Sequence, residues 1–150
     1  MISFETSVRI ERPIEDVFVY VSDPRNFPRW NSVVRAVRKT SAGEDDLGST
    51  YSMERDLPSG RTENGLEIVA KERPREFGIR TTSGPTPFFY LYSFSPTNGG
   101  TIVKLDAEVE LPRAAALVAP LARHAVKKGV DHNFGTLKSI LETARPAPES

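Results

Sequence analysis

Residues 101–144 read TIVKLDAEVELPRAAALVAPLARHAVKKGVDHNFGTLKSILETA, and the hydrophobic pattern changes its period within this stretch. Up to Leu111, apolar and polar residues alternate, which is typical of a strand with one buried face. From Pro112 onward the apolar residues recur at helical spacing, so we expect a long C-terminal helix whose first turns are split off at Pro120. The predicted inner stripe of this helix consists of Val118, Ala122, Val126, Gly129, Val130, Asn133, Leu137, Ile140 and Leu141.

The chain before the helix alternates in the same way between turn signals. Clusters of glycine, proline and asparagine separate six runs that read as strands. The six runs are 33–41, 49–57, 61–72, 75–83, 86–95 and 101–111. Connections as short as these join antiparallel neighbours, so the runs predict an antiparallel meander.

A further strand is predicted near the N-terminus, over residues 3–11, where polar and apolar residues alternate again. Pro13 then suits the first turn of a short helix. Residues 24–31 contain two prolines and two aromatic residues, so we expect a turn or a second short helix. Its Phe27 and Trp30 are expected to pack into the protein core. The predicted fold class is α+β: a seven-stranded antiparallel sheet wraps around a long C-terminal helix, with two short helices after the first strand.

Length and composition limit the possible architectures and functions of the protein. A chain of 150 residues with 20 basic and 20 acidic side chains fits one globular domain, predicted over residues 1–144, with a disordered tail over 145–150. The absence of cysteine excludes thiolate metal sites and disulfides, and we expect no metal and no cofactor. A net charge of zero argues against nucleic acid as a partner, and no apolar run is long enough for stable membrane association. The first residues show no apolar core of a signal peptide, which predicts a cytoplasmic location.

The charge is unevenly distributed although its sum is zero. Residues 111–145 hold six basic and two acidic side chains, so the remainder of the chain is acidic by four charges. A basic helix face of this kind suits an acidic partner or a membrane surface, but a solvated face is the simpler interpretation. Nothing in the sequence decides the oligomeric state, and a homodimer remains one option.

The inward faces of the predicted strands carry many aromatic residues. A mostly apolar cleft with a few converging polar groups is typical of a small-ligand site, so we interpret the set as a pocket lining. Ordinary core packing is the alternative for any single member. The aromatic residues predicted to bind a ligand are Trp30, Tyr51, Phe88, Tyr90 and Tyr92.

Polar residues also fall on faces otherwise reserved for apolar ones: Arg55, Asn64 and Asn133, with Thr81 on the inner face of its strand. We predict that these four residues bind the ligand as well, because a buried guanidinium or amide requires a partner. The fork of Arg55 suits a carboxylate or an enolate oxygen. For Arg55 the alternative is a side chain that snorkels near the strand end, with Asp56 or a loop acid beside it. For Asn133 the alternative is that it caps a helix kink or hydrogen-bonds a neighbouring strand.

No catalytic residue can be assigned. His124 falls on the solvated side of the predicted helix and His132 on its flank, and neither has a carboxylate at a spacing that would make it a general base. Glu44, Asp45 and Asp46 lie in a loop between strands, where solvated charge is the simplest interpretation.

Several local sequences occur in a characteristic order: IERPIEDVF at 10–18, DPRNFPRW at 23–30, GSTY at 48–51, and the long tail from Leu111 to Thr143. With them, residues 1–143 resemble the polyketide cyclase/dehydrase-like branch of the START/Bet v 1 superfamily, also called SRPBCC. The resemblance implies the helix-grip fold, with a ligand cavity between the sheet and the terminal helix. It says little about chemistry, because the superfamily includes lipid carriers, receptors and cyclases.

Two function classes follow from these observations. The favoured one is binding or transport of a small hydrophobic ligand, aromatic or lipid-like, because no nucleophile or acid–base pair can be read from the sequence. The alternative is a cyclase, dehydratase or hydrolase that acts on a polyketide-like or other hydrophobic molecule. A third interpretation is an interaction or regulatory protein with a vestigial cavity. A pocket filled by the protein's own side chains would favour this interpretation.

Overall fold

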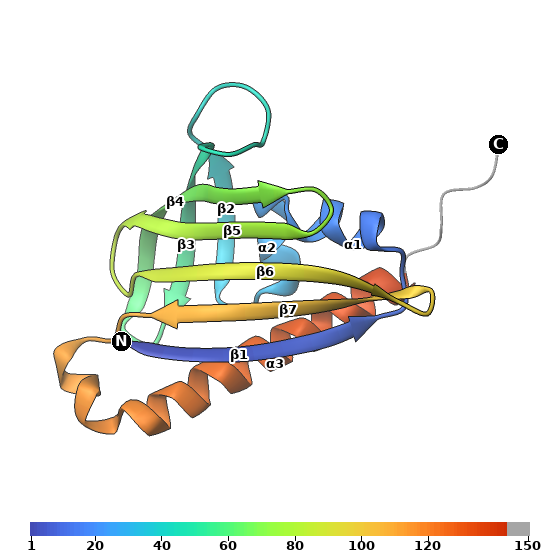
Figure 1. Ribbon diagram of the computed structural model, residues 1–150. Helices are drawn as coiled ribbons and strands as arrows, with labels where there is room; N and C mark the ends of the chain where they lie inside the picture. The colour runs from blue at the N-terminus through green and yellow to red at the C-terminus, as the bar shows by residue number, and fades with distance from the viewer. Residues whose placement is uncertain (144–150) are drawn as a thin grey trace.

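A computed structural model describes residues 1–143 and confirms the predicted order of strands and helices (Figure 1). The predicted tail at 145–150 lies outside the described residues. The elements in chain order are β1 (Ile2–Ile10), α1 (Ile14–Val21), the 3-10 turn η1 (Pro24–Asn26), α2 (Phe27–Trp30), β2 (Val34–Lys39), β3 (Thr50–Leu57), β4 (Gly60–Glu72), β5 (Glu76–Ser83), β6 (Phe88–Thr97), β7 (Gly100–Val109), the 3-10 turn η2 (Arg113–Val118) and α3 (Ala119–Thr143).

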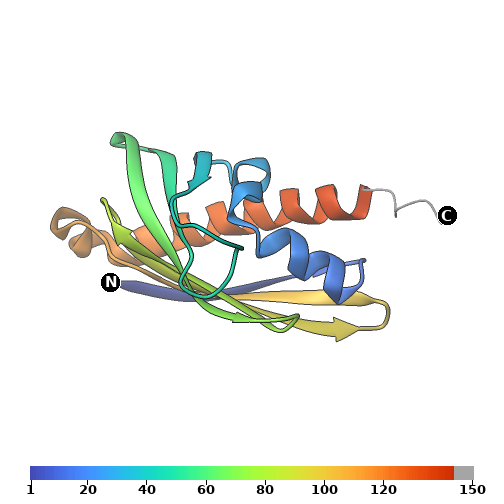
Figure 2. The same ribbon diagram turned by 90° about the horizontal axis from the view of Figure 1, so that it is seen from above.

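The seven strands form one antiparallel sheet in the order β1-β7-β6-β5-β4-β3-β2. Apart from the step from β1 to β7, neighbours in the sheet are neighbours in the sequence, as the short turns predicted. The β4–β5 register shifts twice, once near Gly65 and once between Ile68 and Ala70. Such irregularities let a sheet bend, and the three helices all lie on its concave face (Figure 2).

The core lies between this concave face and the helices, and the strand faces assigned from the alternation point into it. Side chains below 2% exposure include Ile10, Phe18, Tyr51, Leu66, Ile68, Phe77, Leu105 and Leu137. The prediction of the residues on the inner stripe of the C-terminal helix was partly wrong. Phe134, absent from it, is buried, whereas Val118, included in it, is 47% exposed. The reason is that η2 and the first turns of α3 project beyond the end of the sheet (Figure 1), where no other part of residues 1–143 covers them.

Pro120 divides the segment as expected. Residues before it form η2, and α3 begins at Ala119, so the proline occupies the first turn of the long helix, where its missing N–H costs no hydrogen bond. Within residues 1–143, no helix combines the length and the apolar content that crossing a membrane requires.

Basic side chains of α3 donate to backbone carbonyls along β1. The Nε of Arg123 donates to the Ser3 carbonyl over 2.8 Å, and the Nζ of Lys138 donates to the Arg9 carbonyl over 2.6 Å. These bonds lie near opposite ends of the strand. They hold the helix along the outer edge of β1.

Acidic side chains of α3 complete this junction. Asp131 accepts a hydrogen bond from the Thr6 hydroxyl, and Glu142 accepts one from the backbone N–H of Glu11 over 2.8 Å. The helix that closes the concave face is therefore tied to the first strand by hydrogen bonds along most of its length.

Candidate ligand-binding site

A small cavity lies between α2 and the concave face of strands β2, β3, β5 and β6. Its volume is about 40 Å³. That space is enough for a water molecule and far below the roughly 300–1,000 Å³ typical of ligand sites. The lining residues are Phe27, Trp30, Asn31, Val33, Val34, Met53, Arg55, Ile79, Phe88, Tyr90 and Tyr92.

The structure brings five of the predicted site residues together at this cavity: Trp30, Arg55, Phe88, Tyr90 and Tyr92. The other four, Tyr51, Asn64, Thr81 and Asn133, do not line it. The lining that was not predicted comes largely from α2 and the start of β2. A signal existed for Phe27, which was expected to plug into the body, and for Met53, which shares the inner face of β3 with Arg55.

The Arg55 guanidinium forms the polar wall of the cavity. Its side chain lies inside the protein, and the whole residue is only 7% exposed. The Nε donates to Oδ1 of Asn64 over 2.9 Å, and the Nη2 donates to the carbonyls of Pro85 and Thr86 over 3.1 and 3.2 Å. The Nη1 makes no hydrogen bond within residues 1–143.

No carboxylate faces Arg55 in the described part of the chain. Asp56, the partner considered from sequence, points to the other side of the strand and pairs with Arg35 and Arg61. Burial lowers the pKa of Arg55 below its ordinary value. The group nevertheless keeps its charge at neutral pH, since arginine is always protonated in proteins. A cation without an anion therefore stands at the cavity wall, with its guanidinium carbon 5.2 Å from the Phe88 ring centroid.

Asn64 supports Arg55 from behind and does not reach the cavity. Its Nδ2 donates to the carbonyls of Ser83 and Pro85 over 3.1 and 2.9 Å, while its Oδ1 accepts from Arg55. Every polar atom of this fully buried amide is thus used within the protein. Its role is to position the guanidinium against the turn between β5 and β6.

Thr81 and Asn133 have structural partners of their own. The Thr81 hydroxyl accepts a hydrogen bond from the backbone N–H of Phe88 over 3.1 Å, at the start of β6. Oδ1 of Asn133 accepts one from the backbone N–H of Ser32 over 3.1 Å. Asn133 does not line the cavity with Arg55, and its hydrogen-bond partner lies in the turn after α2 and not in a strand.

Tyr51 anchors a loop instead of lining the cavity. Its hydroxyl donates to Asp45, and burial is the main cause that raises the pKa of this tyrosine. Asp45 also pairs with Arg25, and its backbone carbonyl accepts from Lys71 over 2.6 Å. Asp45 is accordingly a tether for the loop between β2 and β3, rather than the solvated loop charge expected from sequence.

Besides Nη1 of Arg55, the Trp30 indole and two tyrosine hydroxyls of the cavity lining have no hydrogen-bond partner within residues 1–143. Nε1 of Trp30 is buried without an acceptor. The hydroxyls of Tyr90 and Tyr92 make no hydrogen bond either. Burial, opposed by nearby Arg55, raises the pKa of Tyr90 to about 12, so its hydroxyl stays protonated and is able to donate. Of these three groups, only Nε1 of Trp30 is a fully buried atom without a partner, and such a donor is costly to leave unpaired.

Aromatic rings occupy most of the remaining space. The Phe88 and Tyr90 rings lie 4.4 Å apart, Trp30 and Phe134 stack at 6.3 Å, and Tyr90 meets Tyr92 edge to face at 6.3 Å. This packing explains the small volume. Tyr90 is the partly exposed member of this aromatic set.

A curved antiparallel sheet that grips a C-terminal helix, with an aromatic cavity beneath α2, defines the helix-grip class of domains. Residues 1–142 match the family described as polyketide cyclase / dehydrase and lipid transport, and the chain belongs to that family. No curated protein matches the sequence.

Solved structures show the same fold at low sequence identity. A START superfamily protein from Mycobacterium smegmatis is 16% identical, with a TM-score of 0.78 over 93% of this chain and 97% of that one. The protein TTHA0849 from Thermus thermophilus is 15% identical, with a TM-score of 0.80 over 96% and 99%. The di-domain ARO/CYC protein StfQ from the steffimycin biosynthetic pathway is 14% identical, with a TM-score of 0.74 over 93% of this chain and 50% of that one. These likenesses confirm the helix-grip fold.

Proposed function

We propose that the protein binds a small hydrophobic molecule that carries an anionic oxygen. The apolar, aromatic part of the ligand lies against Phe88 and Tyr90, and the anionic oxygen accepts from Arg55. The hydroxyl of Tyr90 and the indole N–H of Trp30 supply further donors. The family supports a hydrophobic ligand, and the polar wall adds the preference for an anion.

One observation carries this proposal: a buried guanidinium without a carboxylate partner at the wall of an aromatic cavity. Its neutral acceptors position the fork but leave its charge uncompensated. A charge-assisted hydrogen bond to a ligand contributes about 1.5–3 kcal/mol. Loss of that bond corresponds to a change in affinity of about ten- to a hundredfold.

The test compares a sulfonate with a neutral molecule of similar shape. The fluorescent probe anilinonaphthalene sulfonate is titrated into the protein, and the same titration is made with uncharged phenylnaphthylamine. We expect Arg55→Met to weaken sulfonate binding by about ten- to a hundredfold and to leave the neutral probe nearly unaffected. Arg38→Met is the matched control, because that side chain is 74% exposed on the outer side of β2.

Equal losses for both probes would contradict the proposal, since they would show that Arg55 acts only through the fold. Arg55→Lys separates charge from geometry: it retains the charge but loses the fork, and an intermediate affinity is expected. An Arg55→Met protein that binds the sulfonate as the wild type does would also contradict the proposal.

A second candidate is a cyclase or dehydratase that acts on such a ligand. The observation in its favour is the unpaired, protonated Tyr90 hydroxyl beside Arg55, which together would donate protons or hydrogen bonds to a developing enolate. Mass spectrometry of a co-purified ligand, before and after incubation with the protein, distinguishes the two functions. Turnover that disappears in Tyr90→Phe while binding persists would favour the enzyme.

The small cavity bears on the third interpretation, a protein whose pocket is vestigial. A volume of about 40 Å³ means that a ligand must displace aromatic side chains before it fits. Phe88 and Tyr90 are the rings that must move, because they stand beside Arg55 and Tyr90 is partly exposed. Absence of binding to either probe, even after the cavity is enlarged by substitution, would favour the third interpretation.

A further inference from the structure

An apolar surface is exposed where η2 joins α3. Leu117 is 92% exposed, Leu121 is 71% exposed and Val118 is about half exposed. These three side chains, here called the overhang, lie on the part of the helix that projects beyond the sheet (Figure 1). Contiguous large apolar side chains of this kind usually mark an interaction surface.

The overhang is framed by basic side chains. Arg113 precedes it and Lys128 follows it, and neither makes an ion pair within residues 1–143. Arg123 lies between them and donates only to a backbone carbonyl, that of Ser3. The surface therefore combines an apolar centre with uncompensated positive charge.

The convex face of the sheet carries a shallow groove with the opposite charge. Phe89 and Leu91 of β6 form its apolar floor, and both side chains are partly exposed. Across the ladder, Phe89 pairs with Glu108 and Leu91 pairs with Asp106. The groove measures about 430 Å³, which is room for several side chains.

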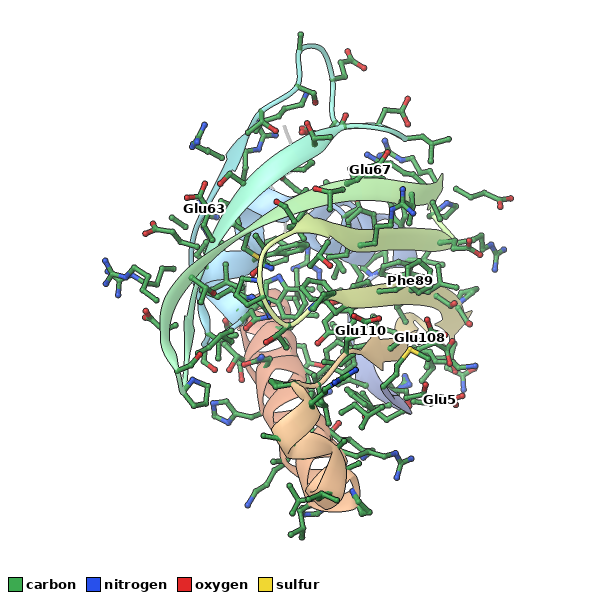
Figure 3. The ribbon with its side chains drawn as sticks, turned by 90° about the vertical axis from the view of Figure 1, so that its left-hand side faces the viewer. Glu5, Glu63, Glu67, Phe89, Glu108 and Glu110 are labelled. Carbon is green, nitrogen blue, oxygen red and sulfur yellow. The ribbon has the colours of Figure 1, made fainter. Side chains whose placement is uncertain are left out.

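Acidic side chains border this groove on the side of β1 and β7. Glu5 and Asp106 share the single cation Lys104, and Glu108 and Glu110 make no ion pair within the described residues. Figure 3 shows Glu5, Phe89 and Glu108 on this face, away from the helix, with Glu110 nearer to the helix. The groove is thus an apolar floor with an acidic rim, complementary to the overhang.

We propose that two copies of this chain associate through these surfaces, the overhang of each copy seated in the convex groove of the other. Leucine side chains of the overhang cover Phe89 and Leu91, while Arg113 and Lys128 meet the acidic rim. Apolar burial supplies most of the affinity, and the charges fix the orientation.

The position of the two surfaces favours a closed two-fold pair. The groove is built from the start of β1, the start of β6 and the end of β7, and η2 follows shortly after Glu110. Both surfaces therefore lie at the same end of the sheet (Figure 3). A two-fold axis at this end makes both contacts at once, which closes the assembly and doubles the buried area.

The charge distribution favours a second copy over an anionic membrane as the occupant. The whole chain is neutral, so two copies do not repel each other, and the basic segment from residue 111 to 145 balances the acidic remainder. A membrane would leave the acidic groove without a partner. A second copy satisfies both surfaces.

The first test measures the mass of the protein by sedimentation equilibrium over a dilution series. We expect a wild-type dimer and, for Leu117→Ser combined with Leu121→Ser, a dissociation constant raised about a hundredfold, because two exposed anchors are lost from each contact. Phe89→Ser is expected to act in the same direction from the other surface. Leu47→Ser is the matched control, a similarly exposed leucine in the β2–β3 loop at 64% exposure.

A charge exchange tests the pairing of the two surfaces. Arg113→Glu and Glu108→Arg are each expected to weaken the homodimer, since each places like charges against each other at both contacts. Mixing the two variants restores a heterodimer, because one contact then has the exchanged charges and the other has the natural ones. Failure of the mixture to associate, when each variant alone is folded by circular dichroism, would overturn the proposal.

Three further outcomes would overturn it. One is a wild-type protein that stays monomeric at the highest concentration reached. Another is a monomer that sediments with phosphatidylglycerol vesicles and loses this property in Leu117→Ser, which would assign the overhang to a membrane. The third is a dimer that is unaffected by Phe89→Ser but lost in Leu117→Ser, which would contradict the proposed groove.

Discussion

The backbone N–H of Ser32 donates to the side chain of Asn133 over 3.1 Å, and this bond joins the segment after α2 to the middle of α3. The Asn133 amide is buried, so the bond is shielded from water. Trp30, two residues before Ser32, stacks on Phe134, the next residue of the helix. The position of one cavity wall therefore depends on a polar contact and a ring contact that neighbour each other in the sequence.

Asn133→Ala is expected to lower the free energy of unfolding by about 1–3 kcal/mol, because the N–H of Ser32 loses its acceptor. Chemical denaturation measures the loss. Thr136→Ala is the control, since that hydroxyl makes only a long bond within the helix, to the His132 carbonyl, and is expected to change stability little.

Phe88→Ala is expected to enlarge the cavity and to strengthen binding of the sulfonate probe, while it lowers stability by up to about 3–5 kcal/mol. Phe94→Ala is the matched control: Phe94 is also buried in β6, but it packs on Phe18 and does not line the cavity. Stronger binding in both variants would show that loosened packing, and not the cavity itself, admits the probe.

Trp30 is expected to report on the cavity, because it is the only tryptophan of the chain and its indole N–H has no acceptor within residues 1–143. Its buried ring predicts a blue-shifted emission in the free protein, and a bound anion that accepts from Nε1 should change that emission. A fluorescence titration with a non-fluorescent aliphatic sulfonate checks this. An unchanged spectrum under conditions where calorimetry shows binding would place the ligand elsewhere.

Acid is expected to loosen the junction between α3 and β1. Burial alone would raise the pKa of Asp131, but hydrogen bonds from Thr6 and Lys127 lower it on balance. A hydrogen bond from Lys138 and one from the Glu11 backbone lower the pKa of Glu142. Because folding depresses both values, the two carboxylates stabilise the fold above their ordinary pKa values of 3.8 and 4.5 and lose this contribution as the pH falls below them.

The measurement is the unfolding free energy as a function of pH. Asp131→Asn combined with Glu142→Gln should flatten its decline on the acid side and lower stability at neutral pH. Glu72→Gln serves for comparison, because that exposed side chain at the end of β4 makes no hydrogen bond within residues 1–143. A decline in the double variant as steep as in the wild type would contradict the assignment.

Arg55 also stabilises the protein without a ligand. Its guanidinium holds Asn64 and two carbonyls of the β5–β6 turn. Arg55→Met should therefore cost about 1–3 kcal/mol in the free protein, and this is why the ligand test compares two probes.

The strand faces were predictable because the period of two leaves only two choices for each strand, and the neighbours of Arg55 decide which one is buried. Its partners were not predictable. The carbonyls of Pro85 and Thr86 lie 30 and 31 positions away, and their approach depends on how the turn before β6 folds over the sheet. The hydrophobic period predicts which face of the strand a side chain occupies, but not which groups it contacts.

The helix shows the same limit of prediction from sequence. Helical spacing placed Asn133 and Leu137 on the inner stripe, and both are buried. The same spacing placed Val118 there, although the sheet ends before that turn. Asn31, Val33 and Val34 also line the cavity but were not predicted, because they follow a helix of four residues, and so short a helix does not fix the direction of the chain in a way that periodicity can reveal.

Two basic side chains of α3 bind the carbonyls of Ser3 and Arg9, and they also hinder the addition of a foreign strand at this edge of the sheet. An open sheet has two borders at which a foreign strand can add and start aggregation. At β1 that border is occupied by the side chains of the helix. At the other border, β2 is short and carries Arg35, Arg38 and Lys39, and charged side chains on a short edge strand disfavour the addition of another strand. Growth of the sheet by strand addition is thereby opposed at both of its edge strands.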